Sequence, residues 1–256
     1  TINIGFQDIA HHSLLNQLEK FDAEHGSVVI METKTGAIKA ISNLGRTSNG
    51  KYYEKLNYAV GESHEPGSTF KLMSMIAAIE DGIVDSKDII DTKNGELVFY
   101  GSKVRDSKKG GYGKITAEEV FKFSSNTGIV EIITNGYSKN PEKFSDRLYN
   151  MGLNKTLDLS IKGEGKPIIP HPKDKNWNGL SLPWMAYGYG VSLTPIQILS
   201  FYNAIANGGE MVKPVFVQNG DSPKKIVLNP SICSKKTISQ VKSMMRSVVN
   251  EDGGTA

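Results

Sequence analysis

The stretch from Lys71 to Ile79 constrains the fold most, because its apolar residues surround a helix on all sides. It reads Lys-Leu-Met-Ser-Met-Ile-Ala-Ala-Ile, and Gly82 follows as a typical helix end. A helix that is apolar all round has to be buried, so other elements must cover it on every side. Lys71 lies at the start of this helix, where a lysine needs a functional reason to be present. A chain of 256 residues is long enough to supply the surrounding core.

The segments before this helix predict another helix and a β-hairpin. Residues 8–21 carry apolar residues close to helical spacing. Two β-prone runs, 27–31 and 37–41, flank a short turn that ends in Gly36, and this pattern predicts an antiparallel hairpin. Glycine at the end of that turn supplies the left-handed conformation that such turns need.

The segments after this helix mix short strands with further helices. Residues 83–115 alternate β-like pieces with turns, and residues 150–190 are rich in Gly, Pro, Lys and Asn, which predicts mainly loop. Thr116 and Thr194 each open a capping box, with Glu or Gln three residues later, so a helix is expected after each. A last amphipathic helix is expected over about 236–249. Together these patterns predict a single α+β domain that covers the whole chain.

Composition excludes several classes of protein. The formal net charge is +3, from 30 basic and 27 acidic residues that are dispersed along the chain, which does not suit a nucleic-acid-binding patch. Cys233 is the single cysteine, so an internal disulfide framework and a thiolate zinc site are excluded. No apolar run approaches the roughly 20 residues that a membrane span needs. Any targeting or anchoring segment is therefore expected outside the residues given.

The first candidate for chemistry is Ser68-Thr69-Phe70-Lys71, which places a hydroxyl and an amine three residues apart. On a helix that begins at Ser68, the two side chains lie on one face, one turn apart. A serine hydroxyl is a good nucleophile only when a base takes its proton, and a desolvated lysine can be that base. Free N–H groups at the helix start would help to bind an oxyanion. In the alternative, Ser68 only caps the helix and Lys71 is solvated, but the apolar residues after Lys71 argue against it.

The second candidate is Ser124-Ser125-Asn126, which interrupts the helix that follows Thr116. Its side chains are expected to project from a turn between two helices into a shared cleft. A hydroxyl and an amide in that place would relay a proton and hold a substrate carbonyl. Serine and asparagine are also ordinary residues of helix junctions, so this segment alone leaves both interpretations open.

Three segments together resemble the penicillin-binding proteins, the serine D,D-transpeptidases that cross-link the bacterial cell wall, and their class B, cell-division type most closely. Residues 65–71, Glu-Pro-Gly-Ser-Thr-Phe-Lys, are similar to the nucleophile segment of that class. Residues 115–126, which end in Ser-Ser-Asn, resemble its second motif and the helix that leads into it. Residues 188–197, Gly-Tyr-Gly-Val-Ser-Leu-Thr-Pro-Ile-Gln, and their continuation to Lys213-Pro214 resemble a third signature. The resemblance spans essentially the whole chain.

This resemblance implies the penicillin-binding transpeptidase and serine β-lactamase-like fold, an antiparallel sheet packed with helices plus an all-helical region. It implies that Ser68 attacks the penultimate D-alanine carbonyl of a stem peptide and that Lys71 takes the serine proton. Ser124 is expected to pass a proton to the leaving D-alanine, and Asn126 to hold Lys71 and the substrate amide. The residues expected to bind substrate are Ser125, Gly188, Tyr189 and Gly190. No cofactor and no metal is expected.

The resemblance also implies partners and a location. Stem peptides and β-lactams are the expected ligands, and a glycosyltransferase and other division-complex membrane proteins are the expected partners. The expected location is the periplasmic face of the cytoplasmic membrane, with the anchor outside this chain. Two alternatives stay open: a serine β-lactamase or β-lactam sensor domain, and an inactive scaffold fragment that binds division partners. The Ser124-x-Asn126 motif and the signature over 194–209 favour the transpeptidase over the β-lactamase.

The Lys-Thr-Gly motif of the family is expected after the last helix. Gly254-Thr255-Ala256 resembles the segment that precedes it, and the residues given stop there. The resemblance therefore implies a transpeptidase domain without its C-terminal Lys-Thr-Gly portion and the strands that go with it. Lys34-Thr35-Gly36 has the same letters, but it lies in the turn of the first hairpin and receives no catalytic role.

Overall fold

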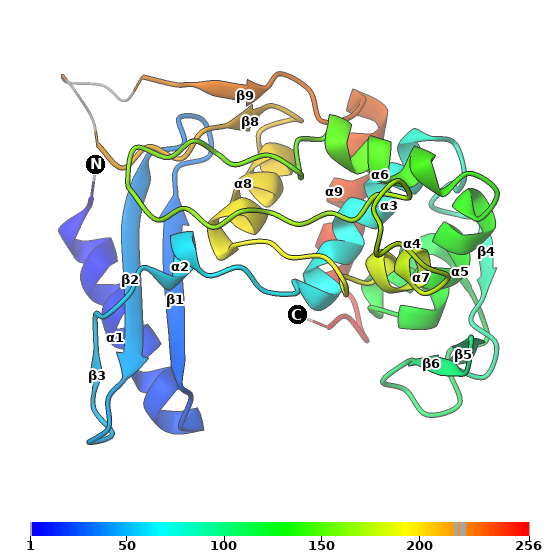
Figure 1. Cartoon of the computed structure of the whole chain (residues 1–256), viewed down its shortest axis with the longest axis horizontal. Helices are drawn as coiled ribbons and strands as arrows, with labels where there is room; N and C mark the ends of the chain where they lie inside the picture. Colours follow the sequence, from blue (N-terminus) through cyan, green and yellow to red (C-terminus); the bar gives the residue numbers. More distant parts are fainter. Residues whose placement is uncertain (1, 218–219, 221–223, 256) are drawn as a thin grey trace. The chain divides into compact units, whose positions relative to one another are not determined.

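The structure is a computed structural model that describes residues 2–217, 220 and 224–255 of the chain. Its helices and strands are labelled in Figure 1. The residues group into two compact units, and each unit is built from three separated segments. The first unit comprises Thr1–His64, Lys155–Pro167 and Leu193–Pro230, and the second comprises Glu65–Asn154, Ile168–Ser192 and Ser231–Ala256. The expectation of a single domain over the whole chain stays a prediction.

The first unit is built on the predicted hairpin. Its sheet has the order β1 (His25–Met31), β2 (Ile38–Arg46) and β3 (Tyr52–Tyr53), with both pairs antiparallel. The register shifts between Ile30 and Met31, which leaves Lys39 as an extra residue in β2. Such a bulge reverses the face to which the next side chain points. Ile38 and Ala40 therefore face opposite sides of the sheet.

α1 (Ile4–Phe21) covers one face of this sheet, and Figure 1 shows it beside β1 and β2. Leu14 and Leu18 of α1 pack there against Leu44 of β2. The helix begins four residues before the predicted start at residue 8. The reason is a cap, because the side chain of Asn3 accepts a hydrogen bond from the backbone N–H of the first turn.

The opposite face of the sheet carries the second apolar cluster of the unit. Its elements are α2 (Tyr58–Gly61), α8 (Pro195–Ala206) and the antiparallel pair β8 (Met211–Val212) and β9 (Val227–Asn229). Ile38 packs in this cluster with three other buried residues, Val60, Leu157 and Ile196. α8 begins at the capping box of Thr194, as the sequence predicts. Both faces of the sheet are thus closed by helices.

The second unit surrounds the helix that carries Lys71. A 3₁₀ turn (Gly67–Phe70) leads into α3 (Lys71–Glu80). Every α3 residue from Lys71 to Ala78 is buried, which confirms the prediction from the apolar circumference. The helices that pack around α3 are α4 (Ala117–Lys122), α5 (Asn126–Tyr137), α6 (Pro141–Asn150) and α9 (Lys235–Asn250).

Residues 83–115 contain short strands, as the sequence predicts. β4 (Ile89–Asp91) pairs with β7 (Lys114–Thr116), and β5 (Glu96–Phe99) pairs with β6 (Ser102–Arg105). Thr116 ends β7 and at once caps α4, and the predicted capping box with Glu119 is complete. One residue thus fixes both the end of a strand and the start of a helix.

Two helices of the second unit are absent from the sequence prediction. The sequence patterns do not indicate α6, and α7 (Ser181–Ala186) lies within the segment 150–190 that is predicted to be mainly loop. The prediction is wrong for α7, which is short and contains Pro183, so neither length nor composition indicates it. Tertiary packing forms it instead: Ala186 is buried, and its carbonyl accepts a hydrogen bond from the Ser74 hydroxyl of α3 (2.8 Å).

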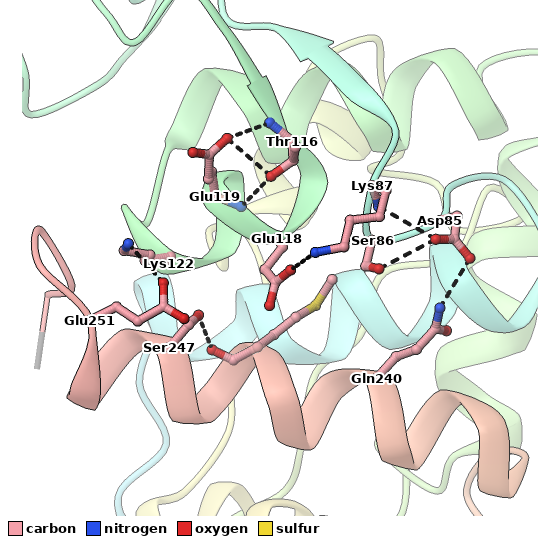
Figure 2. A network of polar contacts seen from close by, with 11 residues as sticks. Asp85, Ser86, Lys87, Thr116, Glu118, Glu119, Lys122, Gln240, Ser247 and Glu251 are labelled. Carbon is pink, nitrogen blue, oxygen red and sulfur yellow. Dashed lines mark hydrogen bonds and ion pairs between the residues drawn. The ribbon is translucent and has the colours of Figure 1, made fainter.

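The predicted last helix is confirmed as α9, and polar side chain contacts connect it to other elements of the unit. Figure 2 shows the polar contacts on this side of the unit. Near the start of α9, the Gln240 amide donates to Asp85 (Nε2–Oδ2 3.0 Å). Just beyond its end, Glu251 pairs with Lys122 of α4 (2.9 Å). Because α4 ends just before Ser124, the contact between Glu251 and Lys122 also stabilises the segment of the second motif.

The comparison of Gly254-Thr255-Ala256 with the segment before a Lys-Thr-Gly motif reaches Ala256, which lies outside the described residues. Of the helices that the structure describes, none combines the length and the hydropathy that a membrane crossing requires.

Candidate active site

Ser68, the predicted nucleophile, lies in the 3₁₀ turn before α3 rather than in the α-helix itself. Its carbonyl accepts a hydrogen bond from the Lys71 N–H, and the Thr69 hydroxyl donates to the Pro66 carbonyl (2.8 Å). Gly67 has a φ of 55°, which turns the chain just before the serine. Side chains three residues apart in a 3₁₀ turn lie one above the other, so Ser68 and Lys71 project from the same side. Ser68 is exposed and therefore accessible to a ligand.

Lys71 is buried, with 2% of the residue exposed. Its Nζ donates to the carbonyl oxygen (2.5 Å) and the hydroxyl (3.0 Å) of Ser124. Burial lowers the pKa of Lys71 from 10.5 to about 7, because desolvation disfavours the ammonium, while the nearby Asp106 carboxylate acts in the opposite direction. At pH 7 about half of such a lysine is neutral, against roughly one in 3,000 for an ordinary lysine. A desolvated lysine thus lies three residues after an exposed serine.

Ser124 occupies the turn that ends α4. The Ser125 N–H donates to the Val120 carbonyl (2.9 Å) and the Ser124 N–H to the Phe121 carbonyl (3.0 Å), which is the bonding pattern of a Schellman cap. The left-handed position of such a cap usually holds glycine, but here Ser124 has a φ of 51°. That conformation costs a serine about 1–2 kcal/mol. It turns both the carbonyl and the hydroxyl of Ser124 toward Lys71, so the strain falls where the chemistry is expected.

Ser125 and Asn126 have contacts that differ from the predicted ones. Ser125 is buried (1% exposed), and its hydroxyl caps α5 by accepting from the Gly128 N–H (2.9 Å). Ser125 therefore caps a helix here, and its contact with substrate stays a prediction. The Asn126 amide donates to the Arg105 carbonyl (2.7 Å), whereas the ammonium of Lys71 is held by Ser124. The expectation that Asn126 holds Lys71 is therefore not met in this geometry, and its contact with a substrate amide stays a prediction.

Asp106 is the residue of this site that sequence reasoning missed. It follows β6 directly, and its carboxylate accepts hydrogen bonds from the Ser125 hydroxyl (3.1 Å), the Thr127 N–H (2.9 Å) and the Thr127 hydroxyl (2.7 Å). It thereby fixes the start of α5, and its charge raises the pKa of Lys71 against the effect of burial. No spacing in the sequence points to it, because the strand that carries it reaches the site only through the fold.

The third signature contacts the residues that lead into the 3₁₀ turn of Ser68. The Gly67 N–H donates to the Gly188 carbonyl (3.1 Å), and the Gly190 N–H donates to the Glu65 carboxylate (2.8 Å). A Cβ at Gly188 would lie 2.0 Å from the Gly67 carbonyl oxygen, so only glycine fits there. Tyr189 lies between these two anchors and is 41% exposed. Residues 188–190 thus hold the segment that carries Ser68, and they place one aromatic ring at the surface beside it.

Lys34-Thr35-Gly36 lies in the hairpin turn, as expected. The Thr35 hydroxyl donates to Glu32, and the Gly36 N–H donates to the Glu32 carbonyl (2.9 Å). Gly36 has a φ of 76°, and the Lys213 carbonyl oxygen would lie 2.2 Å from a Cβ there. Turn geometry and close packing explain this segment without a catalytic role.

The geometry of Ser68, Lys71 and Ser124 agrees with a family comparison. The family described as "Penicillin binding protein transpeptidase domain" matches residues 26–256. The chain belongs to this family. It is 29% identical over 268 residues to stage V sporulation protein D of Bacillus subtilis, covering 99% of the chain and 41% of that protein. It is 25% identical over 259 residues to peptidoglycan D,D-transpeptidase FtsI of Escherichia coli K12, covering 99% of the chain and 42% of that protein.

The transpeptidase-domain fold is also shared with solved structures. The chain superposes with a TM-score of 0.83 on the apo transpeptidase domain of Burkholderia pseudomallei penicillin-binding protein 3, at 27% identity. The superposition covers 99% of this chain and 71% of that one. This likeness confirms the predicted α+β fold of the penicillin-binding type. The chain spans about two fifths of the length of the two curated relatives named above.

Proposed function

We propose that this transpeptidase domain carries the acyl-transfer chemistry of a serine D,D-transpeptidase that cross-links peptidoglycan stem peptides. The observation that carries the proposal is the buried Lys71, whose pKa lies at about 7 and whose Nζ is 3.0 Å from the Ser124 hydroxyl. An exposed Ser68 stands three residues before it on the same side of the turn. The printed name of the Escherichia coli relative, a peptidoglycan D,D-transpeptidase, supports the same reaction.

Acylation starts when neutral Lys71 takes the proton of the Ser68 hydroxyl. The Ser68 oxygen attacks the carbonyl of the penultimate D-alanine, and a tetrahedral oxyanion forms. We assign the Ser68 N–H, at the start of the turn, as a backbone donor to this developing charge. The intermediate collapses when the C–N bond breaks, and the departing D-alanine nitrogen receives a proton from Lys71 through the Ser124 hydroxyl. The product is an ester of Ser68.

Deacylation repeats these steps with an amine of a second stem peptide as the nucleophile. Lys71 has returned its proton and is neutral again, so it can deprotonate that amine through Ser124. The amine attacks the ester, the C–O bond to Ser68 breaks, and Ser68 recovers its proton. A base with a pKa near the working pH suits both proton transfers, since it accepts and donates with little bias. We assign Tyr189 and its flanking glycines to binding of the stem peptide beside Ser68.

The proposal includes a location and partners. We assign the domain to the outer side of the cytoplasmic membrane, at its periplasmic face, where stem peptides are cross-linked. A glycosyltransferase that makes glycan strands, and other membrane proteins of the division complex, are the proposed partners. The support is that one curated relative is named a peptidoglycan D,D-transpeptidase and another a stage V sporulation protein.

Labelling with a fluorescent penicillin tests the assignment, because β-lactams mimic the D-alanyl-D-alanine end and form the same Ser68 ester. Peptide mapping should place the label on Ser68, and the Ser68→Ala variant should show none. Ser160→Ala, at an exposed serine outside the site, serves as the control and should label as the parent does. Label on Ser124 instead, or label that survives Ser68→Ala, would contradict the nucleophile assignment.

The same experiment separates the alternatives. A β-lactamase would release the penicilloyl group within a second, whereas a transpeptidase keeps it for many minutes. A scaffold would take up no label even when the sequence that follows Ala256 is included, and that result would contradict the enzyme assignment.

A further inference from the structure

Three side chains of the first unit bring their donor atoms together. They are His25, Glu62 and His64. The Glu62 Oε2 lies 2.7 Å from the His25 Nε2 and 3.1 Å from the His64 Nε2. All three donor atoms lie within 4.8 Å of one another. Among the described residues, this is the group of three or more His, Cys, Asp and Glu side chains whose donor atoms lie close enough together to hold one metal ion.

Each of the three residues has a backbone that secondary structure holds in place. His25 is the first residue of β1 and pairs with Gly45 of β2. Glu62 closes α2, and its N–H donates to the carbonyl of the first α2 residue (3.2 Å). His64 forms a bridge with Leu193 through both of its backbone groups (3.0 and 2.9 Å). The donors are therefore preorganised, because no loop has to be ordered to assemble them.

The imidazole rings are oriented as well as placed. The His25 ring stacks on the Tyr58 ring, with centroids 4.3 Å apart and planes 19° apart. The His64 ring lies nearly parallel to that of His25, at 26°, with centroids 6.3 Å apart. Both rings present Nε2 to the same carboxylate oxygen. Stacking therefore restricts the rotation by which His25 would otherwise leave the group.

Ordinary hydrogen bonding does not account for this arrangement. The Glu62 Oε2 is enclosed by protein, yet among the described residues no donor reaches it with hydrogen-bond geometry. The Nε2 atoms of both imidazoles lie within hydrogen-bonding distance of Oε2, but neither is oriented to donate a hydrogen bond to it. Donor atoms that surround a metal ion behave in this way, since they lie close together but point at the ion rather than at one another. A buried carboxylate oxygen without a directed donor needs an explanation, and a bound cation supplies one.

We propose that His25, Glu62 and His64 bind one Zn²⁺ ion through two Nε2 atoms and one carboxylate oxygen. Two imidazoles and a carboxylate suit zinc, whereas Mg²⁺ and Ca²⁺ prefer oxygen ligands alone. Zn–N and Zn–O distances of about 2.0–2.2 Å in a tetrahedron put neighbouring donors about 3.3 Å apart. The present spacings of 2.7 and 3.1 Å therefore open by a few tenths of an ångström when the ion enters. Side chains that are 33–53% exposed have room for that adjustment.

The proposed ion has a structural role that is separate from the chemistry of Ser68. It joins the edge of the sheet at β1, the end of α2 and the segment that bridges to Leu193. The fourth position is left for water, because three protein ligands and partly exposed side chains keep it open.

Titration of the untagged chain with ZnCl₂ against a chromophoric chelator tests the site. We expect one ion per chain at pH 7.5, and Co²⁺ should give the intense visible bands of a tetrahedral complex. Glu62→Gln removes the charge but keeps the shape, and His64→Asn removes an exposed ring. Each should weaken Zn²⁺ binding by more than the roughly 10–100-fold typical of losing an outer-shell partner. His12→Asn, at an exposed histidine of α1, is the control and should bind as the parent does.

Thermal unfolding gives a second reading that does not depend on the chelator. Zn²⁺ should raise the melting temperature of the parent and of His12→Asn, but not of Glu62→Gln or His64→Asn. An absence of binding at micromolar Zn²⁺ would overturn the proposal. So would a single ion that binds both ligand variants as tightly as the parent. Labelling of Ser68 by penicillin is read separately, so failure of one proposal does not affect the other.

Discussion

Replacing Lys71 by methionine should make the domain more stable at neutral pH while it abolishes acylation. Methionine has nearly the length of lysine and needs no hydration, so it fills the same buried space. The native lysine is costly to bury because its folded pKa, about 7, lies below the unfolded value of 10.5. Between these two values the unfolded chain binds more protons than the folded one, so the stability of the native protein rises with pH. Lys71→Met removes this dependence.

The magnitude follows from the two pKa values. The difference of 3.5 between 10.5 and about 7 corresponds to about 5 kcal/mol against folding at pH well below 7. At pH 7 the penalty is about 4 kcal/mol, and at pH 9 it is about 2 kcal/mol. Methionine leaves the Ser124 carbonyl and hydroxyl without their donor, which costs about 1–3 kcal/mol. The variant should therefore gain about 2 kcal/mol at pH 7, and the gain should disappear near pH 9.

Urea unfolding of parent and variant at pH 7, 8 and 9 measures this difference. The decrease of the gain by about 2 kcal/mol from pH 7 to pH 9 is the decisive quantity, because the loss of the Ser124 hydrogen bonds affects all pH values alike. Lys109→Met, at an exposed lysine, should show no such dependence. A Lys71→Met variant that is less stable than the parent at pH 7, or a difference that does not change with pH, would refute the account of a desolvated base.

Five further substitutions, at four positions, probe the remaining parts of the site. Asp106→Asn removes the charge that raises the pKa of Lys71, so the acidic limb of the pH profile of penicillin acylation should move to lower pH; a limb that stays in place would rule out this electrostatic role. Ser124→Gly and Ser124→Ala should both slow acylation, by roughly 10²–10⁴-fold. Unfolding should show the glycine variant to be more stable by about 1 kcal/mol, because only glycine is relaxed at a φ of 51°; equal stabilities would argue against strain there. Gly188→Ala should destabilise the domain by about 3 kcal/mol or more, because a Cβ would meet the Gly67 carbonyl at 2.0 Å. Gly190→Ala should cost only about 1 kcal/mol, since its φ is also positive but the space around it is free, and similar melting temperatures for the two would contradict this packing.

The sequence was sufficient where local chemistry decides the structure. The capping boxes at Thr116 and Thr194 determine helix starts through contacts within four residues, and both are present as predicted. The burial of α3 follows from its own apolar circumference. The break at Ser124 was also predictable, because Ser-Ser-Asn is a typical helix junction. In each of these cases the information lies within one turn of the chain.

The rest depends on contacts that no local pattern contains. Asp106 reaches Thr127 across 21 positions of the sequence, and its effect on Lys71 crosses a larger gap still. α7 is formed by packing against α3 and α5 rather than by its own propensity. The partner of Asn126 proved to be the Arg105 carbonyl, because β6 ends next to the start of α5. The contacts of Asp106 and Asn126 appear only when the strands after residue 83 have been placed, and α7 appears only when α3 and α5 have been placed.

The interleaving of the two units limits how such a domain can be divided. The chain passes from one unit to the other after His64, Asn154, Pro167, Ser192 and Pro230. A single proteolytic cut at any of these points leaves both units still connected by the other crossings. Neither unit can be excised as one continuous gene segment. The shortest segment that holds all of the unit with Ser68 and Lys71, residues 65–256, also carries Lys155–Pro167 and Leu193–Pro230 of the other unit. Exchange of that unit by recombination therefore replaces part of its neighbour as well.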